Sequence, residues 1–225
     1  MTNNMGSFIA FFKKEFKIAY RNTSDIFSIF LFFLLGVVIF IFAIGSNKEI
    51  IDQIGVGIIW TLILLSNTLS LRKFFQNDFE DNNLILYHMS GLSYEVIVLL
   101  KVIAFWIYLQ LPFFILIPIA IIFLNIDLLN SYYIFLSFLI GSPIITCISS
   151  ISGSMNLLNN KNFAIGSLII MIFSIPVIIF SVNLTIMSEE ALKANINILL
   201  GLMFLFLSIT PWICSFCIKQ GFQHK

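Results

Sequence analysis

The chain contains six long apolar runs that are almost free of charged residues. A helix rises 1.5 Å per residue, so about 20 apolar residues cross a hydrocarbon core of roughly 30 Å. In lipid, every backbone polar group must be paired within the protein, and a helix pairs its own. The runs cover residues 26–45, 54–71, 96–124, 132–155, 163–187 and 196–218. We therefore predict an all-α integral membrane protein with six transmembrane helices in a single domain over residues 1–225.

Composition agrees with this reading and narrows the kinds of partner. Hydrophobic residues make up 60% of the 225 residues and charged residues only 10%, against about 25% charged in a soluble domain. The formal net charge is +1, which gives no overall field that would attract a polyanion. We expect membrane lipid around the chain and no nucleic-acid partner.

The basic residues are distributed unequally between the two sides of the predicted bundle. Ten of the twelve lie in the N-terminal segment, the second and fourth connections, the start of the third run and the C-terminal tail. The other side holds only Lys48 and Lys193. Because lysine and arginine mark cytoplasmic loops, both termini are predicted to be cytoplasmic. We expect a multi-pass membrane protein.

The segment before the first run, residues 6–22, has the pattern of an amphipathic helix. Phe8, Phe12 and Phe16 recur every fourth residue and so share one face. Basic side chains occupy the other flank, at Lys13, Lys14, Lys17 and Arg21. We predict a helix that lies in the cytoplasmic interface. Two roles stay open for it, an anchor that fixes topology or a mechanical element.

The connection between the second and third runs, residues 72–95, is the longest loop and is rich in aromatic and charged residues. At helical spacing Phe75 and Phe79 share one face, and Asp78 and Asp81 lie three residues apart on another. We predict a short helix that, together with Arg72, docks on a partner protein. The alternative is a surface helix packed on its own bundle.

The sequence contains no residue pattern that indicates catalysis. It has no glycine-rich phosphate-binding loop and no H-E-x-x-H, so we expect a non-catalytic subunit without a metal or directly bound cofactor. His88 and His224 lie outside the apolar runs and are expected to be solvated. Cys147, Cys214 and Cys217 lie within apolar runs and are expected to be packing thiols.

Charge within the runs is limited to Lys101, near the start of the third. We expect its long side chain to extend to the interface. Ion-coupled transporters carry ionisable groups near the bilayer midplane, so this pattern argues against proton or sodium coupling. Asn67, Gln110 and Asn183 are the largest polar groups inside the runs, and we expect each to bond to a neighbouring helix.

A set of motifs from the second run to the fifth resembles a known family. Gly57-Ile58-Ile59-Trp60 opens the second run, and Phe75-x-x-Asp78-x-x-Asp81 follows it. The third run continues with Lys101-Val102-x-x-x-Trp106, Leu111-Pro112 and Pro118, and later runs add Gly141-x-Pro143 and Ile175-Pro176. In these positions the chain resembles CcmB, haem exporter protein B, the permease subunit of the cytochrome c maturation ABC transporter. Two positions depart from that pattern: Asn82 replaces a common glycine, and Phe105 replaces a common histidine.

The resemblance implies a fold, a location and a set of partners. It implies an ABC-2 exporter-like permease whose connection between spans 2 and 3 couples to a separate ATP-binding subunit, CcmA, with CcmC and CcmD as further partners. The location would be the bacterial inner membrane, with the mitochondrial inner membrane as the alternative. Haem would be the substrate of the complex, either through export or through ATP-driven release of the haem-loaded chaperone CcmE. ATP would bind to the partner subunit. Two alternatives remain, a permease for another amphipathic or lipid-like substrate and a scaffold that holds the ATPase and CcmC.

Overall fold

The protein is seen in a computed structural model that describes residues 10–18, 23–45, 48–126, 128–158, 163–186 and 189–223. Every regular element in those ranges is a helix. A short helix covers residues 10–18. The remaining elements are α2 (Thr23–Ile44), α3 (Lys48–Thr68), α4 (Leu71–Glu80), α5 (Asn83–Met89), α6 (Tyr94–Phe105), the π-helix η1 (Trp106–Gln110), α7 (Phe113–Phe123), α8 (Leu128–Met155), α9 (Phe163–Ile186) and α10 (Glu189–Gln223).

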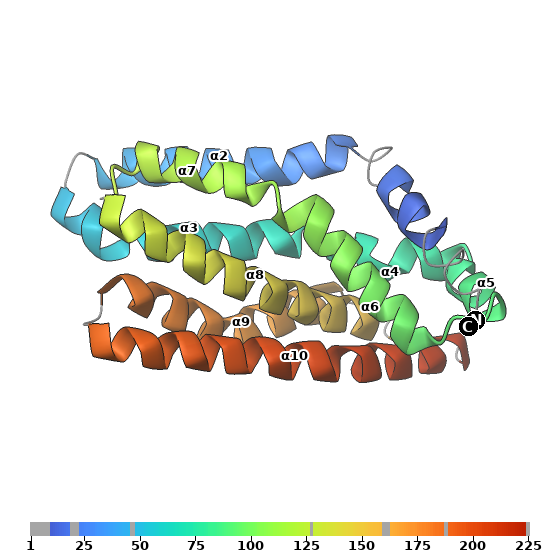
Figure 1. Ribbon diagram of the computed structural model, residues 1–225. Helices are drawn as coiled ribbons and strands as arrows, with labels where there is room; N and C mark the ends of the chain where they lie inside the picture. The colour runs from blue at the N-terminus through green and yellow to red at the C-terminus, as the bar shows by residue number, and fades with distance from the viewer. Residues whose placement is uncertain are drawn as a thin grey trace.

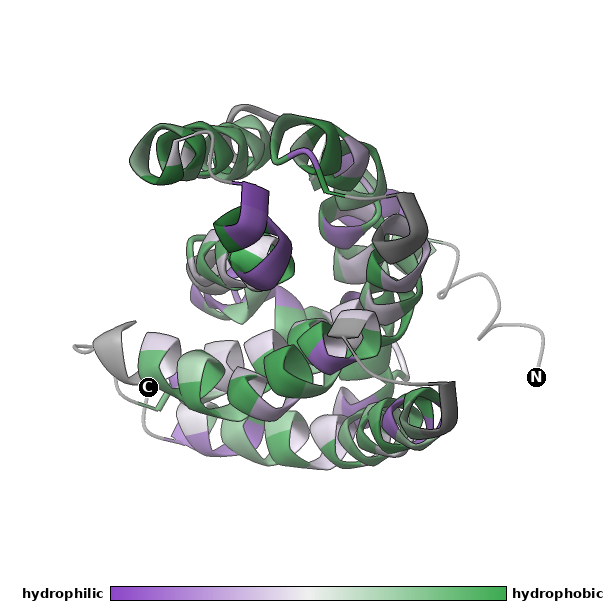
Figure 2. Ribbon diagram, turned by 90° about the vertical axis from the view of Figure 1, so that its left-hand side faces the viewer, coloured by the Kyte–Doolittle hydropathy of each residue, from purple (hydrophilic) through white to green (hydrophobic). Residues whose placement is uncertain are grey.

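Six helical spans are long and apolar enough to cross a membrane, which confirms the predicted all-α membrane fold. They lie side by side along one axis, with α6, η1 and α7 together forming the third (Figure 1). Their outer faces carry large apolar side chains, such as Phe42, Ile122 and Trp212, which are 83%, 74% and 71% exposed. Green hydrophobic positions cover most of the bundle in Figure 2. Such a surface suits lipid rather than water.

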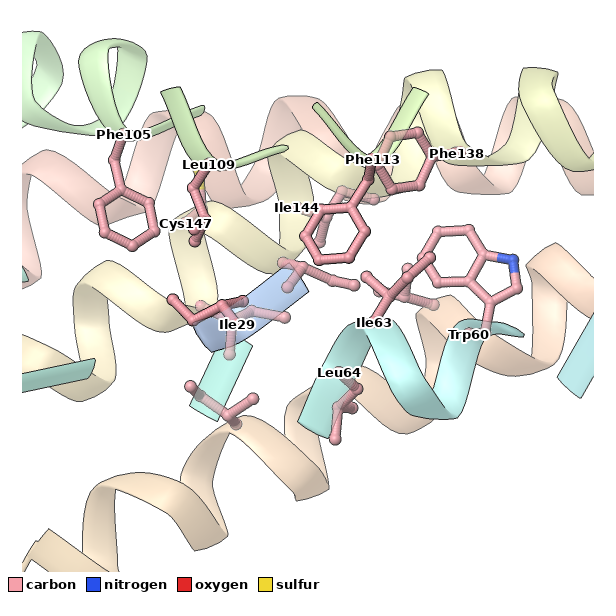
Figure 3. Packing of buried hydrophobic residues seen from close by; sticks show 14 of the residues in the cluster. Ile29, Trp60, Ile63, Leu64, Phe105, Leu109, Phe113, Phe138, Ile144 and Cys147 are labelled. Carbon is pink, nitrogen blue, oxygen red and sulfur yellow. The ribbon is translucent and has the colours of Figure 1, made fainter. Parts of the chain in front are cut away.

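The core is built around α8, which packs against both α9 and α10 and also meets α3, α4, α6 and α7. Side chains from α3, the third span and α8 converge in it, including Trp60, Phe113 and Phe138 (Figure 3). A Cβ at Gly141 would overlap the Trp60 ring, so glycine is needed there for α3 and α8 to approach closely. Pro143 lies within α8 and Pro176 within α9.

The third span, predicted over residues 96–124, is not one continuous α-helix. The α-helix α6 ends at Phe105, η1 follows, and Leu111 and Pro112 form a turn before α7. The Leu111 amide donates to the Trp106 carbonyl at 3.1 Å, the five-residue spacing of a π-helix. Pro112 has no amide proton, so the ladder cannot continue through it. Pro118, by contrast, lies inside α7.

Two other spans have different ends from those predicted. The helix α3 begins at Lys48 and ends at Thr68, whereas the prediction was 54–71, and α10 covers Glu189–Gln223 rather than 196–218. The predictions stopped at the first charged residue, but a helix continues beyond the hydrocarbon core where water can solvate charge. The bundle is therefore longer than its apolar runs.

The helix at residues 10–18, the α4–α5 segment and the C-terminal end of α10 gather at one end of the bundle (Figure 1). We call the α4–α5 segment, residues 71–89, the connector, and this end of the bundle the connector end.

Candidate functional site

The connector is two helices joined at a sharp turn. Asn82 is in the left-handed region with φ of 57°, which asparagine tolerates better than most residues, and so the turn forms without a glycine. The helix α4 packs against α8, and α5 packs against α4 and α6. The predicted helical connection is present, although it contains two helices rather than one.

A buried ion cluster ties the connector to the third span. The Lys101 ammonium on α6 pairs with Asp78 Oδ2 on α4, and its Nζ lies 3.3 Å from Glu15 Oε1 on the helix at residues 10–18. It also donates to the Phe74 carbonyl at 3.1 Å. Lys101, Asp78 and Glu15 are 4%, 7% and 6% exposed, and no other charged side chain whose burial the structure describes is buried. We call these three residues the basal ion cluster.

The sequence predicted that the Lys101 side chain extends to the interface. The structure shows it buried instead. Its side chain turns inward because two carboxylates and a carbonyl lie within reach, and these match the three donors of an ammonium group. A charge removed from water needs such partners, and removing one of a buried pair costs about 3–5 kcal/mol. The cluster thus fixes where α4 lies against α6.

Electrostatics around Asp78 favour its ionised form. Burial raises the pKa of this carboxyl. The Lys101 ammonium, together with Lys14 and the Asn83 amide, lowers the pKa by more than burial raises it, so the pKa lies below its ordinary value. Lys14 Nζ lies 3.9 Å from Asp78 Oδ1, and Asn83 Nδ2 donates to the same oxygen at 3.0 Å. Asp78 is therefore a carboxylate at neutral pH.

The helix at residues 10–18 turns a mixed face to the protein. Phe11 is 2% exposed and its ring meets that of Tyr87 at 4.8 Å, edge to face, while Lys14 lies 4.5 Å from the centre of the Tyr87 ring. Phe16 is exposed and Phe12 is partly exposed, consistent with an outward apolar face. Phe8 lies outside the described residues. Phe11 thus holds this helix on the connector, and Glu15, four residues later on the same face, holds it on α6.

The C-terminal end of α10 holds the connector from another direction. The ring centres of Phe79 and Phe222 lie 4.4 Å apart with their planes tilted by 31°, and a Cβ at Gly221 would lie 3.2 Å from the Phe79 ring. Close by, Lys219 pairs with Glu95 at the start of α6 at 3.1 Å. Segments from both ends of the chain therefore fix the connector.

This packing revises which connector residues a partner could touch. Phe75, Asp78 and Phe79, predicted as docking contacts, are buried within the chain itself because α4 lies on α8 and beneath the end of α10. Asp81 is exposed at the turn. Arg72 lies in α4, but its side chain is outside the described part of the structure. The alternative prediction, a helix packed on its own bundle, describes this face of α4.

Two large apolar side chains of the connector are exposed. Leu86 and Met89 on α5 are 60% and 78% exposed, although they lie outside the six spans. Large apolar side chains on a segment outside the membrane are typical of a protein contact. We call Leu86 and Met89 the connector tip.

A second polar contact lies deeper in the bundle, at the break in the third span. Gln110 Nε2 in η1 donates to Asn67 Oδ1 in α3, and both side chains are completely buried. This confirms the predicted bonds to a neighbouring helix for these two amides. Trp106, also in η1, donates from Nε1 to Ser142 Oγ of α8 at 3.0 Å. Both contacts attach the π-helix, rather than α7, to its neighbours.

Other predicted positions are structural in their surroundings. Trp60 is buried against Phe138, and Pro112 precedes α7, where its missing amide proton leaves no bond unmade. Cys147, Cys214 and Cys217 are buried free thiols. His88 is exposed and stacks on Tyr94 at 4.3 Å, and His224 lies outside the described residues.

Sequence reasoning did not identify Glu15 as a site residue. Glu15 lies among lysines, on a helix that was predicted from the spacing of its phenylalanines. Its partner, Lys101, lies 86 positions later in the chain. One signal was available: an isolated acid four residues after Phe11 interrupts the basic face. It could not reveal which residue it meets.

The geometry defines a polytopic helical membrane protein with a structured connector held by an internal ion cluster. The CcmB protein family matches residues 6–221, and the chain belongs to this family. It is 32% identical to "Heme exporter protein B" of Haemophilus influenzae over 174 residues, 77% of this chain and 79% of that protein. It is 28% identical to the protein of the same name from Bradyrhizobium diazoefficiens over 220 residues, 96% and 99% of the two chains.

Proposed function

We propose that the chain is the membrane permease subunit of an ABC transporter complex that serves haem export and cytochrome c biogenesis in the bacterial inner membrane. The observation that carries the proposal is the family match over residues 6–221, with relatives named heme exporter protein B. The six spans and the distribution of lysine and arginine support a permease with both termini in the cytoplasm.

The complex needs an energy source that this sequence does not encode, since it contains no phosphate-binding loop. We propose that ATP is hydrolysed by a separate subunit, CcmA, and that CcmC, CcmD and, indirectly, the chaperone CcmE complete the system. Haem is the substrate of that system and is not a resident cofactor of this chain.

We propose the connector as the contact for the ATP-binding subunit, with the connector tip and Asp81 as its exposed residues. Leu86 and Met89 supply apolar surface, and truncation of such an anchor typically costs about 2 kcal/mol, or roughly 30-fold in affinity. Phe75, Asp78 and Phe79 act behind this surface by holding α4 in place.

The function is tested in a host that lacks its own haem exporter protein B and receives this chain with its ATP-binding subunit. Haem-stained c-type cytochromes should return, and they should not return with an ATP-binding subunit that cannot hydrolyse ATP. An inserted chain that restores no cytochrome would refute the proposed function. Restoration with the inactive ATPase would show a scaffold instead.

The contact is tested by replacing the connector tip with Leu86→Ser and Met89→Ser together. The ATP-binding subunit should then be lost on purification of the membrane chain, while insertion stays normal. Ile50→Ser with Ile54→Ser is the matched control, because these residues are similarly apolar and exposed, at 41% and 44%, on a different helix, α3. Retention of the ATPase by the tip variant would place the contact elsewhere.

A further inference from the structure

Three elements meet at a single side chain. Lys101 of α6 contacts Asp78 of α4, Glu15 of the helix at residues 10–18, and the carbonyl of Phe74. Its ammonium group faces one carbonyl and two carboxylates, and it is almost completely buried. The connector cannot be displaced from α6 without separating Asp78 from Lys101 and leaving a buried charge without its closest partner.

The two halves of the third span have different neighbours. The helix α6 packs against α10 and α5, whereas α7 packs against α2. Figure 1 shows α7 beside α2, while α6 runs towards the C-terminal end of α10. Between them lie the π-helix and the turn at Leu111 and Pro112, where the regular hydrogen-bond ladder is interrupted. The span can therefore bend there without breaking a helix.

We propose that Lys101 is a positioning residue that makes the connector and α6 move as one body, to which Glu15 attaches residues 10–18. A displacement of the connector would then be delivered along α6 to the break at residues 106–112. This inference rests on the proposed function, because the displacement comes from the ATP-binding subunit. It gives the basal ion cluster a role in transmission, beyond holding the fold.

The two carboxylates contribute unequally to this link. Asp78 makes the closer contact and also receives Asn83 and Lys14, whereas Glu15 Oε1 lies near Lys101 without a well-formed hydrogen bond. If residues 10–18 move away, Glu15 and Lys14 leave together, and Lys101 keeps Asp78. Lys101 and Asp78 then remain together as an ion pair. Asp78–Lys101 is therefore the essential link, and Glu15 is the releasable one.

The inference is tested in the complete complex with an uncharged triple variant, Glu15→Gln, Asp78→Asn and Lys101→Met, which leaves no buried charge unpaired. The variant should be inserted and should bind and support ATP hydrolysis within twofold of the parent. Cytochrome formed per ATP hydrolysed should fall at least tenfold. Lys101→Arg, which keeps the charge, should retain most of that ratio, and Glu15→Gln alone should lower it less than Asp78→Asn alone.

Lys219→Met is the matched control, because it removes the more exposed ion pair with Glu95 at the same end of the bundle. It should change the ratio by less than twofold. An unchanged ratio in the triple variant would overturn the inference. So would failure of that variant to accumulate, since the cluster would then be needed for folding itself. If the parent chain restores no cytochrome while its complex hydrolyses ATP, the proposed function fails, and the variants are not the cause.

Discussion

The two halves of the third span differ in what holds them. The helix α6 is fixed by charge, through Lys101 to Asp78 and Glu15, and its first turn is paired to α10 through Glu95 and Lys219. The helix α7 is held by apolar packing, with Phe113 against Phe30, Phe33 and Phe138. The π-helix and Pro112 divide them.

This difference teaches how one span can transmit movement without being rigid throughout. Ion pairs in a buried site are directional and costly to separate, so they fix relative position, whereas apolar contacts in lipid exchange with little penalty. Polar contacts end at Gln110, the last residue of η1, which bonds to Asn67. The boundary between fixed and adaptable structure therefore coincides with the break in the helix.

The largest expected effect is from Lys101→Met alone. Asp78 and Glu15 would then be buried carboxylates without their cation, and the free energy of unfolding should fall by about 3–5 kcal/mol. Unfolding of the purified chain in detergent measures this, and Lys101→Arg is the control that keeps the charge. A Lys101→Met variant as stable as the parent would mean that the cluster is hydrated and weak.

A smaller loss is expected from Gly141→Ala, which probes the apolar side of the comparison. Its new methyl group would overlap the Trp60 ring, and overpacking of this kind costs about 1–3 kcal/mol. Gly57→Ala on α3 is the matched control, because a Cβ there has no neighbour within 4 Å. The same denaturation experiment compares them. Equal stability of the two variants would show that α3 and α8 are not closely packed in solution.

The smallest expected effect is that of pH on the Asp78–Lys101 link. Because the folded-state pKa of Asp78 is lowered from 3.8, its contribution to stability is fully present above that value and is lost as pH falls through the lowered pKa. Stability attributable to Asp78 should therefore be constant from pH 8 to pH 5. Parent and Asp78→Asn chains should show the same difference in unfolding free energy at both values. A difference that shrinks on acidification within this range would contradict the low pKa.

The sequence predicted the number and kind of spans well, because charge-free length is a direct physical requirement of the bilayer. It also predicted that Asn67 and Gln110 bond to a neighbouring helix, because an amide inside a span lacks water as a partner. It did not predict that Lys101, Phe75 and Phe79 are buried, because their surroundings come from segments distant in the chain. Glu15 and Phe222 complete those surroundings, and no local pattern specifies such pairings.

The central claim is that α4 and α6 move together while α7 moves separately. Spin-label distances in the assembled complex test it most directly, with cysteines at the exposed positions Asn77 on α4, Leu99 on α6 and Ile115 on α7. The buried thiols Cys147, Cys214 and Cys217 are replaced by alanine beforehand. On ATP binding, the 77–99 distance should keep its mean and width, and the 77–115 distance should shift. A 77–99 distance that changes as much as the 77–115 distance would contradict the claim.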